Sequence, residues 1–194
     1  VLEGLIAEHQ PRVFFTQPRL QTPTGSTATL AQLHRVLQLC EQHDILIVEN
    51  DIYADLDPEP RASLASLDQV NRVIHISSFS KTISPAIRVG FLVANPDLVE
   101  DLGQLKLVAG LTSSELTERL AFGALTDSRW RRHLKSVRER LGQAQHRVAG
   151  RLADIGFELF AEPKAGMMLW ARHPEIADSA EVSNRAAELG LRPL

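Results

Sequence analysis

Four side chains within a dozen residues of one another could together hold a phosphorylated aldehyde. Ser78 and Ser80 precede Lys81, directly after an apolar stretch of strand length at residues 73–76, and Arg88 follows. A lysine condenses with an aldehyde through its neutral amine, which partial burial or a nearby cation favours. Hydroxyls and a guanidinium can hold a phosphate, the guanidinium through a charged two-pronged hydrogen bond. The cofactor that this set of groups fits is pyridoxal 5′-phosphate (PLP).

The same segment has two simpler interpretations. A serine-rich turn after a strand can end in a solvated lysine, and spacing alone does not separate that case from a cofactor site. A phosphate-binding P-loop would need spaced glycines ahead of the lysine. No glycine lies between Gly25 and Gly90. Spacing alone therefore disfavours the P-loop and leaves the solvated lysine open.

The residues around Lys81 are similar to the lysine segment of a known family. They resemble the Schiff-base segment of fold-type I PLP enzymes, and specifically the aminotransferase-like domain of MocR-type regulators, a branch of the GntR transcription factors. The similar blocks follow the family's order along nearly the whole chain. They are QTPTG at residues 21–25 (QNPTG in the family), VENDIY at 48–53 (VEDDxY), SSFSKT at 77–82, RVGF at 88–91, LTSSEL at 111–116 and AGMMLW at 165–170.

The resemblance implies a role for each matching residue. Lys81 would form the Schiff base with PLP, and once released by a substrate amine it would be the general base for the substrate α-proton. Ser78, Ser80 and Arg88 would hold the phosphate. Tyr53 would hydrogen-bond the hydroxyl of the pyridine ring. The alternative for Tyr53 is a packed aromatic side chain whose polar tip meets water.

Two positions depart from the family pattern. Asn50 stands where relatives carry the aspartate that keeps the pyridine nitrogen protonated. A neutral amide can only hydrogen-bond to that nitrogen, so we expect a weaker electron sink. Strand alternation points the adjacent Asp51 to the opposite face, which disfavours it as a substitute. Thr22 replaces the asparagine that usually contacts the ring hydroxyl, and it can donate one hydrogen bond over a shorter reach.

The composition is that of a soluble globular protein. The chain has 194 residues, 44% of them hydrophobic, and a net charge of −3. This balance does not suggest wholesale binding to nucleic acid or membrane. No apolar run approaches the ~20 residues of a membrane span, and no signal peptide is evident at the N-terminus. One cysteine excludes an internal disulfide and fits a reducing cytoplasm, where we expect the protein to be.

Other candidate sites are weaker. No histidine has a partner at metal-ligand spacing, so no metal site is expected. Cys40 lies on the apolar stripe of a helix, which predicts a core residue and not a nucleophile. A basic group between residues 129 and 140 could contact nucleic acid, but acidic residues are interspersed, which favours a solvated helix face. The histidines are His9, His34, His43, His75, His133, His146 and His173.

The elements that position these residues alternate between strands and helices. We expect strands at residues 12–16, 45–48, 73–76 and 89–93, and helices at residues 29–43 and 96–125, the second with a bend at Gly103 or Gly110. This order predicts an α/β fold with a mostly parallel sheet covered by helices. It agrees with an incomplete large domain of the fold-type I aminotransferases over residues 1–125.

After residue 126 the pattern changes. A long charged helix is expected at residues 128–155, and strands at 157–160 and 167–171 form a hairpin. A further helix is expected at residues 180–189. We therefore predict that residues 126–194 comprise a connecting helix and part of a small α+β C-terminal domain.

The chain is expected to be part of a longer protein, since relatives place further site residues upstream and downstream of the matching blocks. Two functions follow from the resemblance. The chain is either the PLP-binding effector domain of a MocR-type regulator, which senses PLP or an amino compound and binds DNA through another domain, or a catalytic aminotransferase acting between an amino acid and a 2-oxo acid. LTSSEL, ENDIYADL and the altered ring contacts favour the regulator. Either form is expected to be a homodimer, because fold-type I sites are usually built at a dimer interface.

Overall fold

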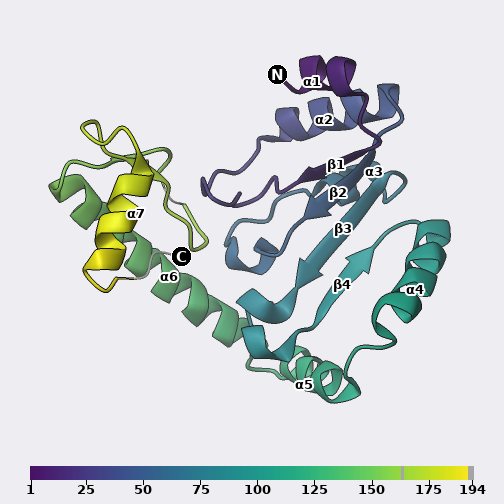
Figure 1. The fold of residues 1–194 in the computed structure, drawn as a ribbon. Coiled ribbons are helices and arrows are strands. Elements are labelled where there is room, and N and C mark those ends of the chain that lie inside the picture. The colour runs from purple at the N-terminus through teal and green to yellow at the C-terminus, as the bar shows by residue number, and fades with distance from the viewer. Residues whose placement is uncertain (163, 192–194) are drawn as a thin grey trace.

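A four-stranded sheet forms the centre of the computed structural model, which describes residues 1–162 and 164–191. The strands lie in the order β1-β2-β3-β4, with the first three parallel and β4 antiparallel to β3. The mostly parallel sheet predicted from the sequence is thus confirmed (Figure 1). The strands are β1 (Val13–Thr16), β2 (Leu46–Asn50), β3 (Val73–Ser78) and β4 (Gly90–Val93).

Helices precede and follow each strand of this sheet. Helix α2 begins with a capping box, in which Thr29 and Gln32 each bond the other's backbone N–H. Helix α4 begins at Pro96, directly after Asn95, whose side chain accepts from the N–H of Leu98. The helices of this half are α1 (Leu2–His9), α2 (Leu30–Gln42), α3 (Leu64–Asp68), α4 (Pro96–Gly110) and α5 (Glu115–Thr126).

The single helix predicted at residues 96–125 is in fact two helices. Helix α4 ends at Gly110, and Leu111 has a positive φ of 59°, a conformation that a helix interior does not allow. Gly103 stays inside α4 without interrupting it. The predicted bend near Gly110 was therefore close to the right position, but the helix ends there and a new one begins at Glu115.

Helix α6 (Trp130–Asp154) connects the sheet to the C-terminal elements. These are the antiparallel pair β5 (Glu158–Leu159) and β6 (Ala171–Arg172), followed by α7 (Ser179–Glu188). In Figure 1, α4 and α5 lie beside β4, and α6 runs away from the sheet towards the segment that holds α7. The long helix, the hairpin and the last helix were all predicted, although the paired strands are shorter than expected.

The main core lies between the sheet and helices α1 to α3. Cys40 of α2 is fully buried, together with Ile45 and Ile47, and Val73 completes the group on β3. Burial raises the pKa of the Cys40 thiol. A raised pKa keeps the thiol protonated and poorly nucleophilic, as expected for a core residue.

A second, smaller cluster joins the sheet to the C-terminal segment. Its buried members are Leu20, Tyr53 and Leu56, and Val137 of α6 and Met168 pack against them. This cluster holds the turns that follow β1 and β2 against α6.

Many apolar side chains of β4, α4 and α5 are exposed. Phe91 is 45% exposed and Val108 is 89% exposed. The outer edge of β4 has no partner strand among the described residues. None of the helices in the described part of the chain is long and apolar enough to cross a membrane.

Candidate functional site

The turn after β3 brings the two predicted serines together. Ser78 is the last residue of β3, and its hydroxyl accepts from the Ser80 N–H at 3.1 Å and donates to the Ser80 hydroxyl at 2.9 Å. The bond from the Ser80 N–H to the Ser78 hydroxyl caps the short 3₁₀ helix η2 (Phe79–Lys81), which ends in Lys81. Lys81 is exposed, whereas the next residue, Thr82, is only 3% exposed. The backbone on either side of the amine is thus fixed while the amine itself is accessible.

Arg88 returns to the same place from the other side of the loop. The chain passes through the 3₁₀ helix η3 (Pro85–Ile87), and the carbonyl of Val89 then accepts a hydrogen bond from the N–H of Phe79 at 3.1 Å. The same carbonyl lies 3.3 Å from the Ser78 hydroxyl and is the alternative acceptor for its one hydrogen. Arg88 has φ 51°, in the left-handed region. A non-glycine residue held in this region carries strain, which proteins tend to retain at functional sites. In the described part of the chain neither Lys81 nor Arg88 forms an ion pair, so both side chains are available to a ligand.

The turn that carries Thr22 lies against the C-terminal segment. Its ends are closed by a hydrogen bond from the Gly25 N–H to the Gln21 carbonyl. Gly25 has φ 70°, and a Cβ there would lie 3.1 Å from the carbonyl oxygen of Met168. The turn therefore needs glycine for its backbone conformation and for the approach of Met168. Thr22 itself is exposed, and its peptide bond to Pro23 is cis.

Asn50 ends β2 and uses its side-chain carbonyl locally. The Oδ1 atom accepts from the N–H of Ile52 at 3.3 Å. Since only the oxygen of an amide can accept that bond, the NH₂ group is the free end of the side chain. Tyr53, three residues on, is 3% exposed and packs against Leu20 and Leu56. The structure thus places Tyr53 in the second apolar cluster.

Asp51 belongs to a buried charged group that the sequence did not reveal. It is 3% exposed and forms an ion pair with Arg19, with Nε and Oδ1 3.3 Å apart. Burial raises the pKa of Asp51, and the Arg19 charge opposes that effect. No hydrogen bond aligned with Oδ1 is present among the described residues, so this contact is a charge pair without ideal geometry. Buried residues alternate along β2 up to Asp51, as strand geometry requires.

Glu49 is the centre of the same group. Its carboxylate accepts from the N–H groups of Leu64 and Ala65 at 2.8 and 3.0 Å, at the start of α3. It also contacts Nδ1 of His75 at 3.2 Å. Burial alone would raise the pKa of Glu49, but the hydrogen bonds from His75, Ala65 and Leu64 outweigh it and lower that pKa. The hydrogen bond to Glu49 raises the pKa of His75, against the opposing effect of burial.

This group has the residue types of a metal site. One potential ligand atom from each of Glu49, Asp51 and His75 lies within 4.8 Å of the others. However, both oxygens of Glu49 already accept backbone hydrogen bonds, and the Arg19 cation occupies the side of Asp51. A divalent cation would have to displace those donors and sit beside a guanidinium. The arrangement therefore fits a structural role better than a metal site: Glu49 caps the start of α3 and joins β2 to His75 of β3.

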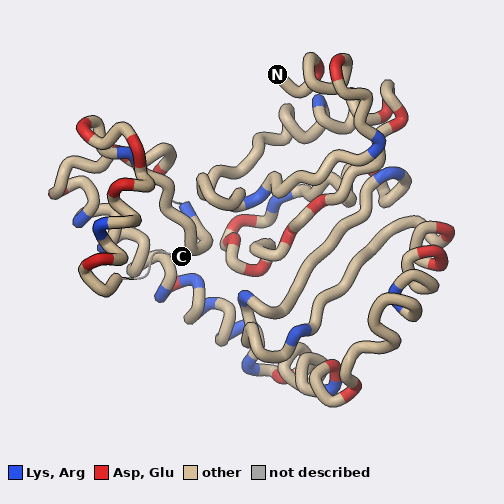
Figure 2. Tube along the Cα trace, viewed as in Figure 1, with Lys and Arg blue, Asp and Glu red and all other residues tan. Residues whose placement is uncertain are grey.

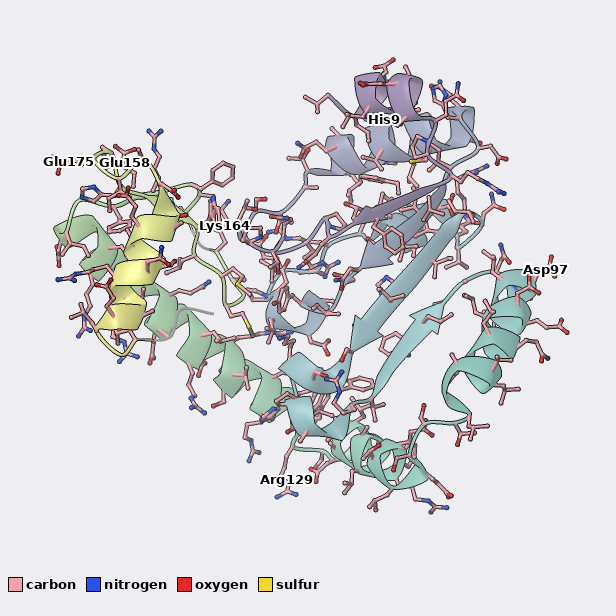
Figure 3. All side chains as sticks on the ribbon, viewed as in Figure 1. His9, Asp97, Arg129, Glu158, Lys164 and Glu175 are labelled. Atoms are coloured by element: carbon pink, nitrogen blue, oxygen red, sulfur yellow. The ribbon has the colours of Figure 1, made fainter. Side chains whose placement is uncertain are left out.

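The basic residues near the start of α6 have acidic neighbours. Figure 2 shows mostly blue segments along this helix, and the acidic neighbours are Asp127 in the turn before it and Glu139 within it. Arg129, labelled in Figure 3, pairs with Asp127 and lowers the pKa of that carboxyl to about 2, chiefly through its side-chain hydrogen bond. Lys135 and Glu139 lie 3.8 Å apart. These local pairs fit a solvated helix face.

The residues at the lysine turn fit PLP in chemical type. An accessible amine, two hydroxyls that contact each other and a strained arginine without an ion pair in the described structure lie at one end of β3 and β4. On the neighbouring strand, Asn50 presents an amide NH₂. The hydroxyls and the guanidinium suit a phosphate, and the amine suits a carbonyl. The group for the pyridine nitrogen, Asn50, is a neutral amide where a carboxylate would be expected.

Comparison with known proteins gives one family model and several relatives. The model described as aminotransferase class I and II matches residues 2–188. The HTH-type transcriptional regulator NorG of Staphylococcus aureus (strain USA300) is 32% identical over 164 residues, which are 82% of this chain and 37% of NorG. The 2-aminoadipate transaminase of Thermus thermophilus is 30% identical over 194 residues, covering 96% of this chain and 49% of that enzyme.

A solved structure shows the same arrangement of elements. LysN, the α-aminoadipate aminotransferase of Thermus thermophilus, was crystallised in complex with N-(5′-phosphopyridoxyl)-L-leucine. It superposes with a TM-score of 0.87 at 30% sequence identity, over 98% of this chain and 51% of LysN. The chain spans about half or less of the length of these relatives.

Proposed function

The chain belongs to the class I and II aminotransferase family, and from this we propose that it is the PLP-binding effector domain of a MocR-type transcriptional regulator. In this proposal the domain senses PLP or an amino compound, and a DNA-binding segment outside these 194 residues responds. The similarity to NorG, a regulator by name, supports this assignment. Residues 1–125 would form the PLP-binding part and residues 126–194 the connecting helix with part of a smaller domain.

Each predicted residue has a task at the site. Lys81 would attach the cofactor covalently through its amine and, once free, would take a proton from the bound amino compound. The hydroxyls of Ser78 and Ser80 and the guanidinium of Arg88 would hold the phosphate. Tyr53 and Thr22 would contact the ring hydroxyl, and Asn50 the ring nitrogen. PLP, when bound, would supply an electron sink for charge that develops at the α-carbon.

The observation that carries the regulator proposal is the pair Asn50 and Asp51. The oxygen of Asn50 is engaged by Ile52, so the amide can offer the ring nitrogen only an N–H donor. A nitrogen that accepts a hydrogen bond is unprotonated and draws electrons less strongly than a pyridinium. Asp51 is held by Arg19 within a buried group. A site of this kind would bind an amino compound well and turn it over slowly, which suits a sensor.

A catalytic aminotransferase is the second candidate. The similarity to 2-aminoadipate transaminase has nearly the same identity as that to NorG and covers more of the chain. Under this proposal the protein moves an amino group between an amino acid and a 2-oxo acid. Under either proposal we expect a homodimer in the cytoplasm, since sites of this family usually form between two subunits.

A DNA-binding titration on the protein as its gene encodes it separates the two functions. Affinity is measured at fixed salt, with and without PLP and candidate amines, in wild type and in Lys81→Ala. A sensor must bind its ligand differently in two states, so DNA affinity should change with ligand and the change should depend on Lys81. Lys106→Ala, at an exposed lysine of α4, is the control. Fast multiple-turnover transamination without DNA binding would replace the regulator by the enzyme.

A further inference from the structure

Helix α6 contacts the turn that carries Lys81. The Nε2 atom of His133 lies 2.7 Å from the carbonyl oxygen of Thr82, the residue directly after Lys81. A carbonyl oxygen can only accept, so Nε2 carries a hydrogen and donates it. The Thr82 hydroxyl is buried without a hydrogen-bond partner in the described part of the chain. His133 therefore supplies the side-chain hydrogen bond that fixes this residue.

The imidazole of His133 is itself held in place. Its ring stacks on that of Trp130, with centroids 5.6 Å apart and the planes at 25°. Trp130 is the first residue of α6, so the stack joins two successive turns at the start of the helix. His133 is nevertheless an exposed residue, so replacing it removes no part of a core.

The same helix makes two more contacts of this type. Nε of Arg138 donates to the carbonyl of Asp55 at 2.8 Å, just after Tyr53. Nε2 of Gln145 donates to the carbonyl of Met168 at 3.3 Å, and Met168 lies against Gly25 in the turn that carries Thr22. From His133 to Gln145 the helix rises about 18 Å. One rigid element thus contacts the backbone at or beside three turns of the site.

We propose that His133 is a positioning residue for Lys81, which ties the lysine turn to α6 through the Thr82 carbonyl. The proposal rests on PLP attachment at Lys81. Without the imidazole donor, the buried Thr82 carbonyl loses its partner and the turn is free to rotate the amine away from the cofactor aldehyde. Because α6 also contacts the turns at Asp55 and Met168, a shift of the helix on ligand binding would move all three together.

Three variants in the protein as its gene encodes it test the role. His133→Phe keeps an aromatic ring for Trp130 but removes the donor, and His133→Gln keeps an N–H donor of similar reach. His146→Phe is the matched control, because His146 is an exposed histidine of the same helix with no hydrogen bond among the described residues. We expect PLP attachment to Lys81 to slow about fivefold in His133→Phe, the effect of one hydrogen bond. His133→Gln should recover most of the rate.

Absorbance follows the rate of PLP attachment. Borohydride reduction and peptide mass spectrometry identify the lysine to which PLP is attached. The circular dichroism band of bound PLP gives a second readout, since it reports how firmly the ring is oriented, and it should weaken only in His133→Phe. If His133→Phe does not fold, His133→Asn replaces it, because the shorter amide cannot reach the Thr82 carbonyl.

The outcomes separate this proposal from the proposed function. If wild type attaches no PLP at Lys81, the proposed function fails, and acetic anhydride labelling of Lys81 relative to Lys106 then tests His133 without the cofactor. An unchanged labelling ratio in a folded His133→Phe variant overturns the positioning role. So does a wild-type rate of PLP attachment together with a wild-type circular dichroism band.

Discussion

The guanidinium of Arg19 pairs with the carboxylate of Asp51 at 3.3 Å, within a group that excludes most solvent. Arg19 also donates from its other end to the carbonyl of Arg61 at 3.0 Å. The pair fixes the turn that leads to Thr22 against the end of β2. Asp51 therefore has a structural partner, and the adjacent Asn50 is left as the side chain at this strand end that is free to meet a ligand.

Asn50→Asp should increase transamination. A carboxylate at this position can pair with a protonated pyridine nitrogen and stabilise charge that the amide cannot. We expect a rate gain of about tenfold or more with a test amino acid and 2-oxo acid, since each ~1.4 kcal/mol is tenfold. No gain with PLP still bound would mean that another group, such as Asp51, already serves the ring nitrogen.

PLP should attach to Lys81. Borohydride reduction of the loaded protein, followed by peptide mass spectrometry, is expected to find the adduct on this residue because its turn holds the hydroxyl pair of Ser78 and Ser80. Lys106 and Lys164 serve as internal controls in the same digest. An adduct on either of these lysines instead of Lys81 would refute the assignment.

Arg88→Ala and Arg88→Gly should have the same effect on binding and different effects on stability. Both remove the guanidinium, so PLP affinity should fall about tenfold or more, the loss of a charged hydrogen bond. The residue has φ 51°, which glycine adopts without strain. The free energy of unfolding of Arg88→Gly should therefore be about 1 kcal/mol higher than that of Arg88→Ala. Equal stability of the two variants would show that the turn relaxes around alanine.

The free energy of unfolding should depend on pH through Glu49 and His75. The pKa of His75 is raised from 6.5, so its contribution is complete below pH 6.5 and is lost as the pH rises through the raised value. The pKa of Glu49 is lowered from 4.5, so its contribution is complete above pH 4.5 and is lost as the pH falls through the lowered value. Chemical denaturation across this range should show a maximum between the two limits.

His75→Gln should remove the loss on the alkaline side of that maximum and diminish the loss on the acidic side, because His75 is the largest of the influences that lower the pKa of Glu49. His43, an exposed histidine, provides the control substitution His43→Gln. If wild type and His75→Gln lost stability in parallel above pH 6.5, another group would be responsible for the alkaline limb.

The sequence predicts most of the sheet because the signals for its strands are local. Short apolar runs fall at β1 to β4, and the apolar stripe that includes Cys40 marks α2. Between α4 and α5 the sequence predicts a bend near Gly110 and not the end of a helix, because no proline there interrupts the helical pattern. Leu111 adopts a positive φ, which is uncommon for a leucine and which its residue type does not predict.

The candidate site was predictable only in part. Lys81, Ser78 and Ser80 are close in sequence, so their meeting follows from one turn. The contact of Glu49 with His75 depends on the register of β2 and β3, in which these two residues are direct partners. The available signal was that side chains alternate between the two faces of each strand, so that Glu49 and His75 could lie on the same face. The bond between His133 and Thr82 joins distant segments, and no sequence pattern announces it.

The uncovered side chains of β4, α4 and α5 have a practical consequence for anyone who produces this polypeptide by itself. An unpaired strand edge flanked by helices with exposed apolar side chains favours self-association by strand pairing and hydrophobic contact. The residues concerned include Phe91, Leu92, Val93, Leu105, Val108, Leu116 and Phe122. A preparation limited to these 194 residues should therefore have low solubility and elute from a sizing column as larger particles at higher concentration, whatever the state of its cofactor site.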